Sequence, residues 1–347
     1  MRALQIQSWQ SDPVLTEVPE PDPGPGEVVV RIGGSGACHS DLHLLHDFTE
    51  GMVPWDPPFT LGHENAGWVH ALGRGVSDLE VGEPVAVYGP WGCGRCPRCR
   101  VGMENYCERA AEIGVAGGGL GRDGGMAPLM LVPSSRLLVP LGDLDPVEAA
   151  PLTDAALTPY HAIKRSAALL GPGSTTVVIG IGGLGHMGVQ LLAATTPTRI
   201  IAVDTRDDAL ALARRAGAET AVAAGDDAPA AILDATAGLG ADVVIDMVGS
   251  DESLALATTV ARSYSHITVV GIGGGNFSFG FFSVPYECSV ATTYWGSLPE
   301  LLEVVELARR GSIRAEVTRV DLEGAAGAYE DLAHGRVAGR LVVVPGS

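Results

Sequence analysis

The sequence predicts an α/β protein of two domains, one with a doubly wound parallel sheet and one rich in β-strands. The length of 347 residues is about twice that of a usual domain. Short apolar runs divided by Gly and Pro fill the first 150 residues or so. After them, apolar strands alternate with Ala/Leu-rich helical stretches, the pattern of βαβ units. With 46% hydrophobic and 18% charged residues, the chain has a globular composition.

The β-rich part is predicted to be a small barrel-like domain with long loops. Its expected strands cover 28–30, 68–69, 85–87, 129–132 and 137–139.

The α/β part has the character of a Rossmann domain. Its expected strands are 176–180, 199–204, 242–248, 266–272 and 290–296, and its expected helices 184–194, 209–216, 254–262 and 299–309. Short strands are expected to follow, up to 341–344. The predicted Rossmann domain, 154–291, is therefore inserted between two parts of the β-rich domain, 1–153 and 292–347.

Charge and hydropathy exclude several classes of partner. The 22 Lys and Arg against 41 Asp and Glu give a net charge of −19, the wrong sign for binding nucleic acid or an anionic membrane. No run approaches the roughly 18 uncharged apolar residues of a membrane span. The N-terminus lacks the apolar core of a secretory signal, so a cytoplasmic protein is expected.

Four of the six cysteines form a spaced cluster. Cys93, Cys96, Cys99 and Cys107 stand as C-x2-C-x2-C-x7-C. Four thiolates at this spacing can wrap one tetrahedral Zn²⁺ completely, which predicts a closed, structural zinc lobe at about 90–110. An iron–sulfur cluster also uses four cysteines, but its common spacings differ.

A glycine-rich turn predicts a dinucleotide site. The expected strand 176–180 runs into Gly180-Ile181-Gly182-Gly183-Leu184-Gly185, a helical pattern follows, and Asp204 ends the next strand. The helix N-terminus would bind the phosphates, and Asp204 would bind the ribose hydroxyls, which favours NAD. Arg206 favours NADP instead, because a nearby Arg can bind the 2′-phosphate of that cofactor.

In order and combination, these motifs resemble the zinc-dependent medium-chain alcohol dehydrogenases from end to end. The resemblance includes Gly36-x-Cys38-His39-Ser40-Asp41, Gly62-His63-Glu64 and Gly339-Arg340, besides the cysteine lobe and the glycine turn. The local sequences around Cys93 and Asp154 are similar to those of the bacterial, actinobacterial-type, NAD-dependent secondary-alcohol dehydrogenases. The resemblance implies a GroES-like fold for the β-rich catalytic domain, and two zinc ions per subunit with NAD.

The resemblance assigns a second zinc, with an open ligand position, to Cys38, His63 and Asp154. Many family members have a second Cys in place of Asp154, which keeps one negative charge on the ligand. Glu64 would lie beside these ligands and ligate transiently; a structural acid bonded within its loop is the alternative. His39 and Arg340 would face the cofactor pyrophosphate.

The implied reaction is hydride transfer from a zinc-bound alkoxide to NAD. The alcohol proton would pass to Ser40, through the nicotinamide ribose, to His43, whose ordinary pKa is near neutral. Some relatives are apolar at the position of His43, so a pocket or surface histidine is the alternative. We expect Trp55, Leu120, Phe282, Tyr294 and Trp295 to form apolar pocket walls, although aromatic residues more often belong to the core.

The leading hypothesis is therefore a zinc- and NAD-dependent oxidoreductase for neutral secondary alcohols and ketones, including aryl-alkyl ones. A dehydrogenase for primary alcohols, aldehydes or polyols is the alternative. A catalytically silent cofactor-binding protein would lack a zinc ligand or Ser40, and all are present. The resemblance also implies a homo-oligomer, a tetramer rather than a dimer, through pairing of the strand 290–296 across a two-fold axis.

Overall fold

The computed structural model describes residues 1–346, which fall into two units. Unit 2 is Thr158–Tyr294, and unit 1 comprises Met1–Leu157 together with the residues from Trp295 onward. Unit 2 thus interrupts unit 1 in sequence, and Asp154 belongs to unit 1.

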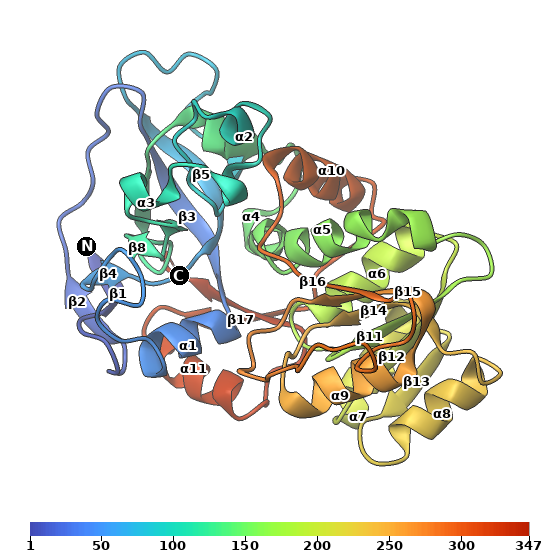
Figure 1. Ribbon diagram of the computed structural model, residues 1–347. Helices are drawn as coiled ribbons and strands as arrows, with labels where there is room; N and C mark the ends of the chain where they lie inside the picture. Colours follow the sequence, from blue (N-terminus) through green and yellow to red (C-terminus); the bar gives the residue numbers. More distant parts are fainter. Residues whose placement is uncertain (347) are drawn as a thin grey trace. The chain divides into compact units, whose positions relative to one another are not determined.

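Unit 2 contains a six-stranded, fully parallel sheet in the order β13-β12-β11-β14-β15-β16 (Figure 1). The order reverses beside β11, and α6 packs against α7 while α8 packs against α9, so the sheet is doubly wound as predicted. The strands are β11 (Thr175–Ile179), β12 (Arg199–Asp204), β13 (Thr220–Ala223), β14 (Ala241–Asp246), β15 (Ala261–Val269) and β16 (Ser289–Thr292). The helices are α5 (Leu157–Arg165), η4 (Ala167–Leu169), α6 (Gly185–Thr195), α7 (Asp207–Ala216), α8 (Ala228–Ala235) and α9 (Asp251–Val260).

Continuous β-branched runs explain the central strands of unit 2. Val177, Val203 and Val244 are fully buried in its core, together with Ile201 and Ile267. Parallel strands are covered by helices on both faces, so apolar residues need not alternate with polar ones.

Unit 1 is built around the long strand β3 (Val28–Ala37), which pairs with β5, β9 and β18. The sheet order is β10-β6-β5-β3-β18-β17, and a smaller sheet has the order β2-β1-β4. The other strands are β1 (Arg2–Ile6), β2 (Val14–Glu17), β4 (Phe59–Thr60), β5 (Glu64–Leu72), β6 (Pro84–Val87), β7 (Gly117–Gly118), β8 (Gly121–Arg122), β9 (Leu129–Val132), β10 (Leu138–Pro140), β17 (Val317–Asp321) and β18 (Arg340–Val344).

Most helices of unit 1 are short. They are α1 (His39–His46), α2 (Pro97–Arg100), η1 (Glu104–Tyr106), α3 (Ala110–Ile113), η2 (Ser135–Leu137), α4 (Pro146–Ala149), η3 (Ala150–Thr153), α10 (Leu298–Arg309) and α11 (Ala325–Ala333). Among residues 1–346, none of the helices is both long enough and apolar enough to span a membrane.

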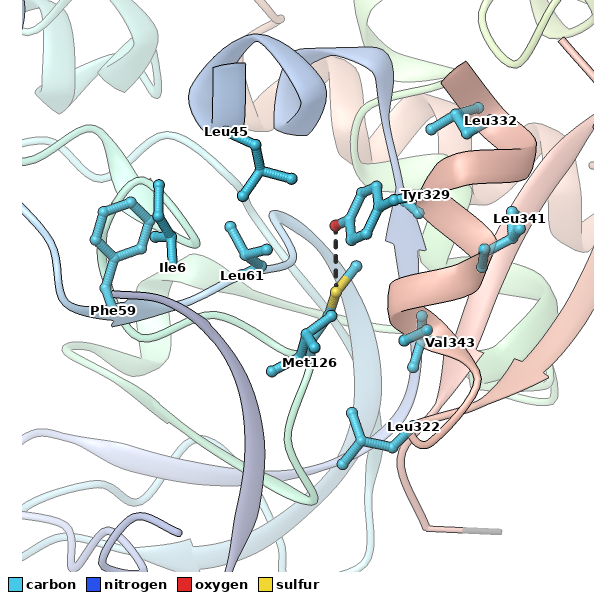
Figure 2. Close-up of a cluster of buried hydrophobic side chains, with 14 residues drawn as sticks. Ile6, Leu45, Phe59, Leu61, Met126, Leu322, Tyr329, Leu332, Leu341 and Val343 are labelled. Atoms are coloured by element: carbon cyan, nitrogen blue, oxygen red, sulfur yellow. Dashed lines mark hydrogen bonds between the residues drawn. The ribbon is translucent and has the colours of Figure 1, made fainter. Parts of the chain in front are cut away.

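Two local expectations are wrong. The strand expected at 290–296 ends at Thr292, and Trp295 adopts a left-handed φ of 54°, which a strand cannot contain. The short strands expected before 341–344 include the helix α11. Ala325, Ala328, Tyr329 and Leu332 recur at helical spacing and are buried in the unit 1 core, so packing selects the helix (Figure 2).

Candidate active site

Three metal-ligand side chains from distant parts of unit 1 meet at one point. Cys38 follows β3 and caps α1, His63 precedes β5, and Asp154 follows η3. One ligand atom from each lies within 4.8 Å of the other two, and all three residues are buried. The structure therefore brings together the Cys, His and carboxylate that the sequence resemblance links.

The distances and donor types suit a zinc ion. The Asp154 Oδ2 atom lies 3.9 Å from Cys38 Sγ and 3.7 Å from His63 Nε2. Tetrahedral zinc, with bonds of about 2.0–2.3 Å, holds such atoms about 3.3–3.7 Å apart, so a small contraction completes the site. Three protein ligands leave the fourth position for a substrate.

Asp41 sets the orientation of His63. Its Oδ1 lies 2.9 Å from His63 Nδ1, and the carboxylate is wholly buried. With zinc at Nε2, the Nδ1 proton is donated to Asp41, which fixes the imidazole ring and its tautomer. Burial opposes protonation of His63, but Asp41 and Asp154 raise its pKa well above the ordinary value.

Glu64 and Arg340 form a buried ion pair next to the ligands. Arg340 donates from Nε to Glu64 Oε2 at 2.8 Å and from Nη2 to Oε1 at 2.6 Å, and Nη2 lies 3.8 Å from Asp154 Oδ2. Glu64 Oε1 also accepts the Ala155 N–H at 2.9 Å. Burial raises the pKa of Glu64 to about 7, against the opposing effect of Arg340. Arg340 thus braces Glu64 and Asp154, and its contact with pyrophosphate stays a prediction.

The two residues of the predicted proton relay share one face of α1. Ser40 Oγ lies 3.2 Å from His63 Nε2, and His43 stands three positions further along the helix. The partly exposed His43 contacts Asp47 Oδ2 through Nδ1 at 2.5 Å, which leaves Nε2 for proton exchange. His39 is exposed at the start of the same helix.

Trp295 lines the metal site. Its ring meets His63 edge to face, with centroids 5.5 Å apart, and its Nε1 donates to Thr153 O at 2.8 Å. It is buried, and its left-handed backbone turns the ring toward the ligands. Trp295 therefore connects the positions of two ligands, His63 and Asp154.

The other expected pocket residues have different surroundings. Trp55 packs at the border of the unit 1 core, and Leu120 is partly buried in the turn between β7 and β8. In unit 2, Tyr294 and Phe282 are 45% and 88% exposed. Their roles as pocket walls stay predictions.

The four cysteines of the lobe 90–110 also converge. Cys93, Cys96, Cys99 and Cys107 each place a sulfur within 4.8 Å of the others. The sulfur of Cys99 lies 3.4 Å from that of Cys96 and 3.9 Å from that of Cys93, near the separation of about 3.8 Å that tetrahedral zinc imposes. All four positions of such an ion are filled, so the site is structural.

Backbone groups prepare this lobe for a metal. N–H groups at Cys96, Cys99 and Arg109 point at sulfurs, and the Arg95 amide lowers the pKa of Cys93 to about 6. Burial raises the pKa of Cys99 to about 12, so this thiol needs the cation to ionise.

Glu104 ties the lobe to the rest of unit 1. It pairs with Arg136 and accepts the Gly92 N–H at 2.7 Å. This ion pair was not predicted, because nothing in the sequence spacing relates Glu104 to Arg136.

The glycine turn of unit 2 has the shape of a phosphate-binding turn. Gly180 has a φ of 85°, and a Cβ at Gly185 would lie 1.9 Å from Gly180 O. A Cβ at Gly182 would meet no atom within 4 Å, while Gly183 and Leu184 are partly exposed beside the N-terminus of α6. Backbone N–H groups at a helix N-terminus bind anions, so this turn suits a pyrophosphate.

Asp204 closes the turn at the end of β12. It accepts Ile181 N–H at 2.6 Å and Arg206 N–H at 2.9 Å. The Arg206 guanidinium lies between two carboxylates, 3.8 Å from Asp204 and 3.7 Å from Asp208.

Comparisons with known proteins identify the family. The chain matches the "Alcohol dehydrogenase GroES-like domain" over residues 24–143 and the "Zinc-binding dehydrogenase" family over 183–310. It is 35% identical to the alcohol dehydrogenase of Aeropyrum pernix, whose crystal structure superposes with a TM-score of 0.92 over 99% of this chain and 100% of that one. The chain belongs to the zinc-dependent medium-chain alcohol dehydrogenase family.

Two further similarities concern substrates. D-arabinose 1-dehydrogenase (NADP(+)) of Saccharolobus solfataricus is 34% identical, over 99% of this chain and 97% of the relative. The structure of acetophenone reductase from Geotrichum candidum in complex with NAD matches with a TM-score of 0.85 and 30% identity, over 99% of this chain and 97% of that one.

Family membership confirms the predicted cofactors, zinc and NAD, and the GroES-like and Rossmann-like folds. In this chain, the roles of two polar residues were not predicted: Asp41, which contacts the ligand His63, and Tyr329, which contacts Asp41. Asp41 was visible as the last residue of the Gly36–Asp41 motif and as an acid in the first turn of α1, but neither assigned it a role.

Proposed function

We propose that the enzyme transfers hydride between NAD(H) and a neutral secondary alcohol or its ketone, aryl-alkyl substrates included. The observation that carries this proposal is the buried group of Cys38, His63 and Asp154, with Ser40 Oγ 3.2 Å from His63 Nε2 and the Trp295 ring against His63. Bound zinc supplies a Lewis acid that lowers the pKa of an alcohol, and NAD supplies the hydride acceptor.

The protein residues hold and move the proton. Ser40 accepts the hydroxyl proton of the substrate but cannot keep it, because a serine has no basic form near neutral pH. His43 would receive the proton and exchange it with solvent, and its contact with Asp47 fixes the ring. Asp41 and Arg340 keep His63, Glu64 and Asp154 in place while this happens.

The surroundings favour an uncharged substrate with an apolar side. Arg340, the cation beside the ligands, is buried and engaged by Glu64, so it does not offer its charge to a substrate carboxylate or phosphate. Trp295 presents an aromatic ring at the ligands. The similarity to an acetophenone reductase supports an aryl-alkyl ketone as a substrate.

We also propose NAD in preference to NADP. Asp204 would accept hydrogen bonds from the ribose hydroxyls and repel a 2′-phosphate. Arg206 already lies between Asp204 and Asp208, which reduces its attraction for that phosphate.

One pair of isomers tests the substrate class. Purified enzyme should form NADH faster with 1-phenylethanol than with its primary isomer, 2-phenylethanol, and a chelator should abolish both rates. Preference for the primary isomer would contradict the substrate class but not the zinc chemistry. Inactivity with both, in protein that contains two zinc ions per subunit, would overturn the proposal.

The oxidation of a polyol or sugar is the second candidate, favoured by the 34% identity to a D-arabinose dehydrogenase. D-arabinose assayed beside 1-phenylethanol, with NAD and NADP in turn, separates the two. A higher kcat/KM for the sugar would replace the first proposal by the second.

We propose that the protein forms a homo-oligomer, a tetramer rather than a dimer. We also propose that it is located in the cytoplasm. The edge strand β16 leaves one side of the unit 2 sheet open to pairing, in support of an oligomer. A cytoplasmic location keeps cysteines reduced, as the thiolate ligands of both zinc sites require.

A further inference from the structure

Tyr329 on α11 makes a polar contact that the reaction proposed above does not use. Its hydroxyl donates to Asp41 Oδ2 at 2.9 Å, across 288 positions of sequence. Figure 2 shows the ring entering the apolar cluster of unit 1 from α11, with its oxygen facing Met126. Both Tyr329 and Asp41 are buried.

Three donors hold the Asp41 carboxylate. Its Oδ1 faces His63 Nδ1, and its Oδ2 accepts the Cys38 N–H and the Tyr329 O–H, each at 2.9 Å. Two of these donors belong to zinc-ligand residues. Tyr329 is the third, and it comes from a different element.

The Tyr329 hydroxyl donates its hydrogen bond to Asp41 because the carboxylate is the stronger of its two neighbouring acceptors. Its second neighbour, Met126 Sδ at 3.3 Å, is a weak acceptor, whereas a carboxylate is a strong one. A buried carboxylate needs its donors to stay ionised and in one orientation. Losing the tyrosine hydroxyl would leave Oδ2 with the single N–H of Cys38 and allow the carboxylate to turn away from His63.

We propose that Tyr329 is a positioning residue for the open zinc site, which acts through Asp41 to hold His63 Nε2 toward the metal. This inference rests on the proposed function only in assuming that Cys38, His63 and Asp154 bind zinc. Partners of metal ligands typically contribute about 10–100-fold in metal affinity. Tyr329 acts one contact further away, so we expect about tenfold, at the lower end of this range.

The test compares Tyr329→Phe with Met126→Leu. The first removes the hydroxyl and keeps the ring, while the second removes the sulfur neighbour and keeps the bond to Asp41. Zinc affinity is measured by competition with a chromogenic chelator, and the four-cysteine zinc of the same molecule serves as internal reference. Tyr329→Phe should lower the affinity of the open site about tenfold, with Met126→Leu and the internal reference unchanged.

Cobalt substitution gives a second measurement. It would not change if Tyr329 only stabilised the fold. The visible absorption bands of Co²⁺ in the open site report ligand geometry, so they should shift in Tyr329→Phe and not in Met126→Leu. Wild-type zinc affinity and cobalt bands in Tyr329→Phe would overturn the inference. Failure of the unmutated enzyme to bind zinc at Cys38 would instead contradict the proposed function.

A double-mutant cycle tests the route through Asp41. If Tyr329 acts through the carboxylate, Tyr329→Phe should add little to the loss of zinc affinity caused by Asp41→Asn. Additive losses would contradict the inference. Should Tyr329→Phe not fold, the Tyr329 hydroxyl proton of the unmutated enzyme can be followed by NMR. It should shift when zinc is added, and an unchanged resonance would overturn the proposal.

Discussion

At the scale of single residues, the open zinc site joins three carboxylates and one guanidinium in a buried space. Asp41, Glu64 and Asp154 are buried with Arg340, while the exposed Asp47, just after α1, contacts His43. Each of these carboxylates has its own principal neighbour. Asp41 serves His63, Glu64 serves Arg340, and Asp154 keeps an oxygen near the other two ligands.

The first prediction concerns Ser40. Ser40→Ala removes the group that first receives the alcohol proton, so kcat should fall by about 100-fold or more, as expected for proton transfer by a positioned group. The zinc content should remain two per subunit, because Ser40 is not a ligand. Steady-state kinetics and metal analysis on one preparation check both. An unchanged kcat would exclude Ser40 from the relay.

A second prediction concerns cofactor preference. Asp208→Ala removes one of the two carboxylates around Arg206, so the ratio of kcat/KM for NADP to that for NAD should rise about threefold, in line with an exposed ion pair. Asp207→Ala is the matched control, because Asp207 is an equally exposed acid one position earlier on α7. An equal change in both variants would assign the effect to net charge instead.

At the scale of elements, the cysteine lobe connects two segments of unit 1. Glu104 joins it to Arg136, and the Leu298 N–H at the start of α10 donates to Gly102 O at 2.8 Å. The lobe has short helices of three or four residues, too short to be stable alone. We therefore expect its order to depend on the metal.

The third prediction follows from this dependence. Cys96→Ser should reduce the zinc content from two ions per subunit to one and lower the Tm, while zinc at Cys38 is retained. Cys288→Ser is the control, because Cys288 is a buried free thiol outside both ligand sets. Metal analysis and differential scanning calorimetry provide the measurements. A Tm equal to that of the control would show that the lobe is ordered without its metal.

At the scale of the whole molecule, a run of exposed aromatic residues precedes the edge strand β16 in unit 2. Phe279, Phe281, Phe282 and Tyr286 are all more than 60% exposed, and the rings of Phe281 and Phe282 lie 4.9 Å apart. Such rings are an expected part of an interface between subunits.

The fourth prediction tests this interface. The double variant Phe281→Ser and Phe282→Ser should dissociate the proposed oligomer, with a lower mass by light scattering at micromolar concentration. Leu239→Ser, which changes an exposed apolar residue elsewhere in unit 2, should leave the mass unchanged. A monomeric mass for the unmutated enzyme would contradict the proposed oligomer before any variant is made.

The local pattern of apolar residues and breaks predicted many of the strands and helices. The elements that it did not predict depend on packing between distant parts of the chain. The strands 129–132 and 199–204 match β9 and β12, because each is an apolar run between clear breaks. Helix α11 was expected as strand, since its helical spacing acquires meaning only against the core that it joins.

The site shows the same division. Its glycine turn and cysteine lobe were visible as local motifs, whereas Cys38, His63 and Asp154 were linked by family resemblance alone. The contacts from Arg340 to Glu64 and from Tyr329 to Asp41 span 276 and 288 positions, and no spacing rule reaches so far.

The interrupted order of unit 1 has a consequence for biosynthesis. Domains generally fold in the order in which the ribosome makes them. Cys38, His63 and Asp154 leave the ribosome before any of unit 2, but Tyr329 and Arg340 follow only after all of it. The nascent enzyme therefore carries three zinc ligands, without Tyr329 and Arg340, for as long as unit 2 takes to be translated. We therefore expect tight loading of the open site to be a late event, completed only after unit 2 has been translated.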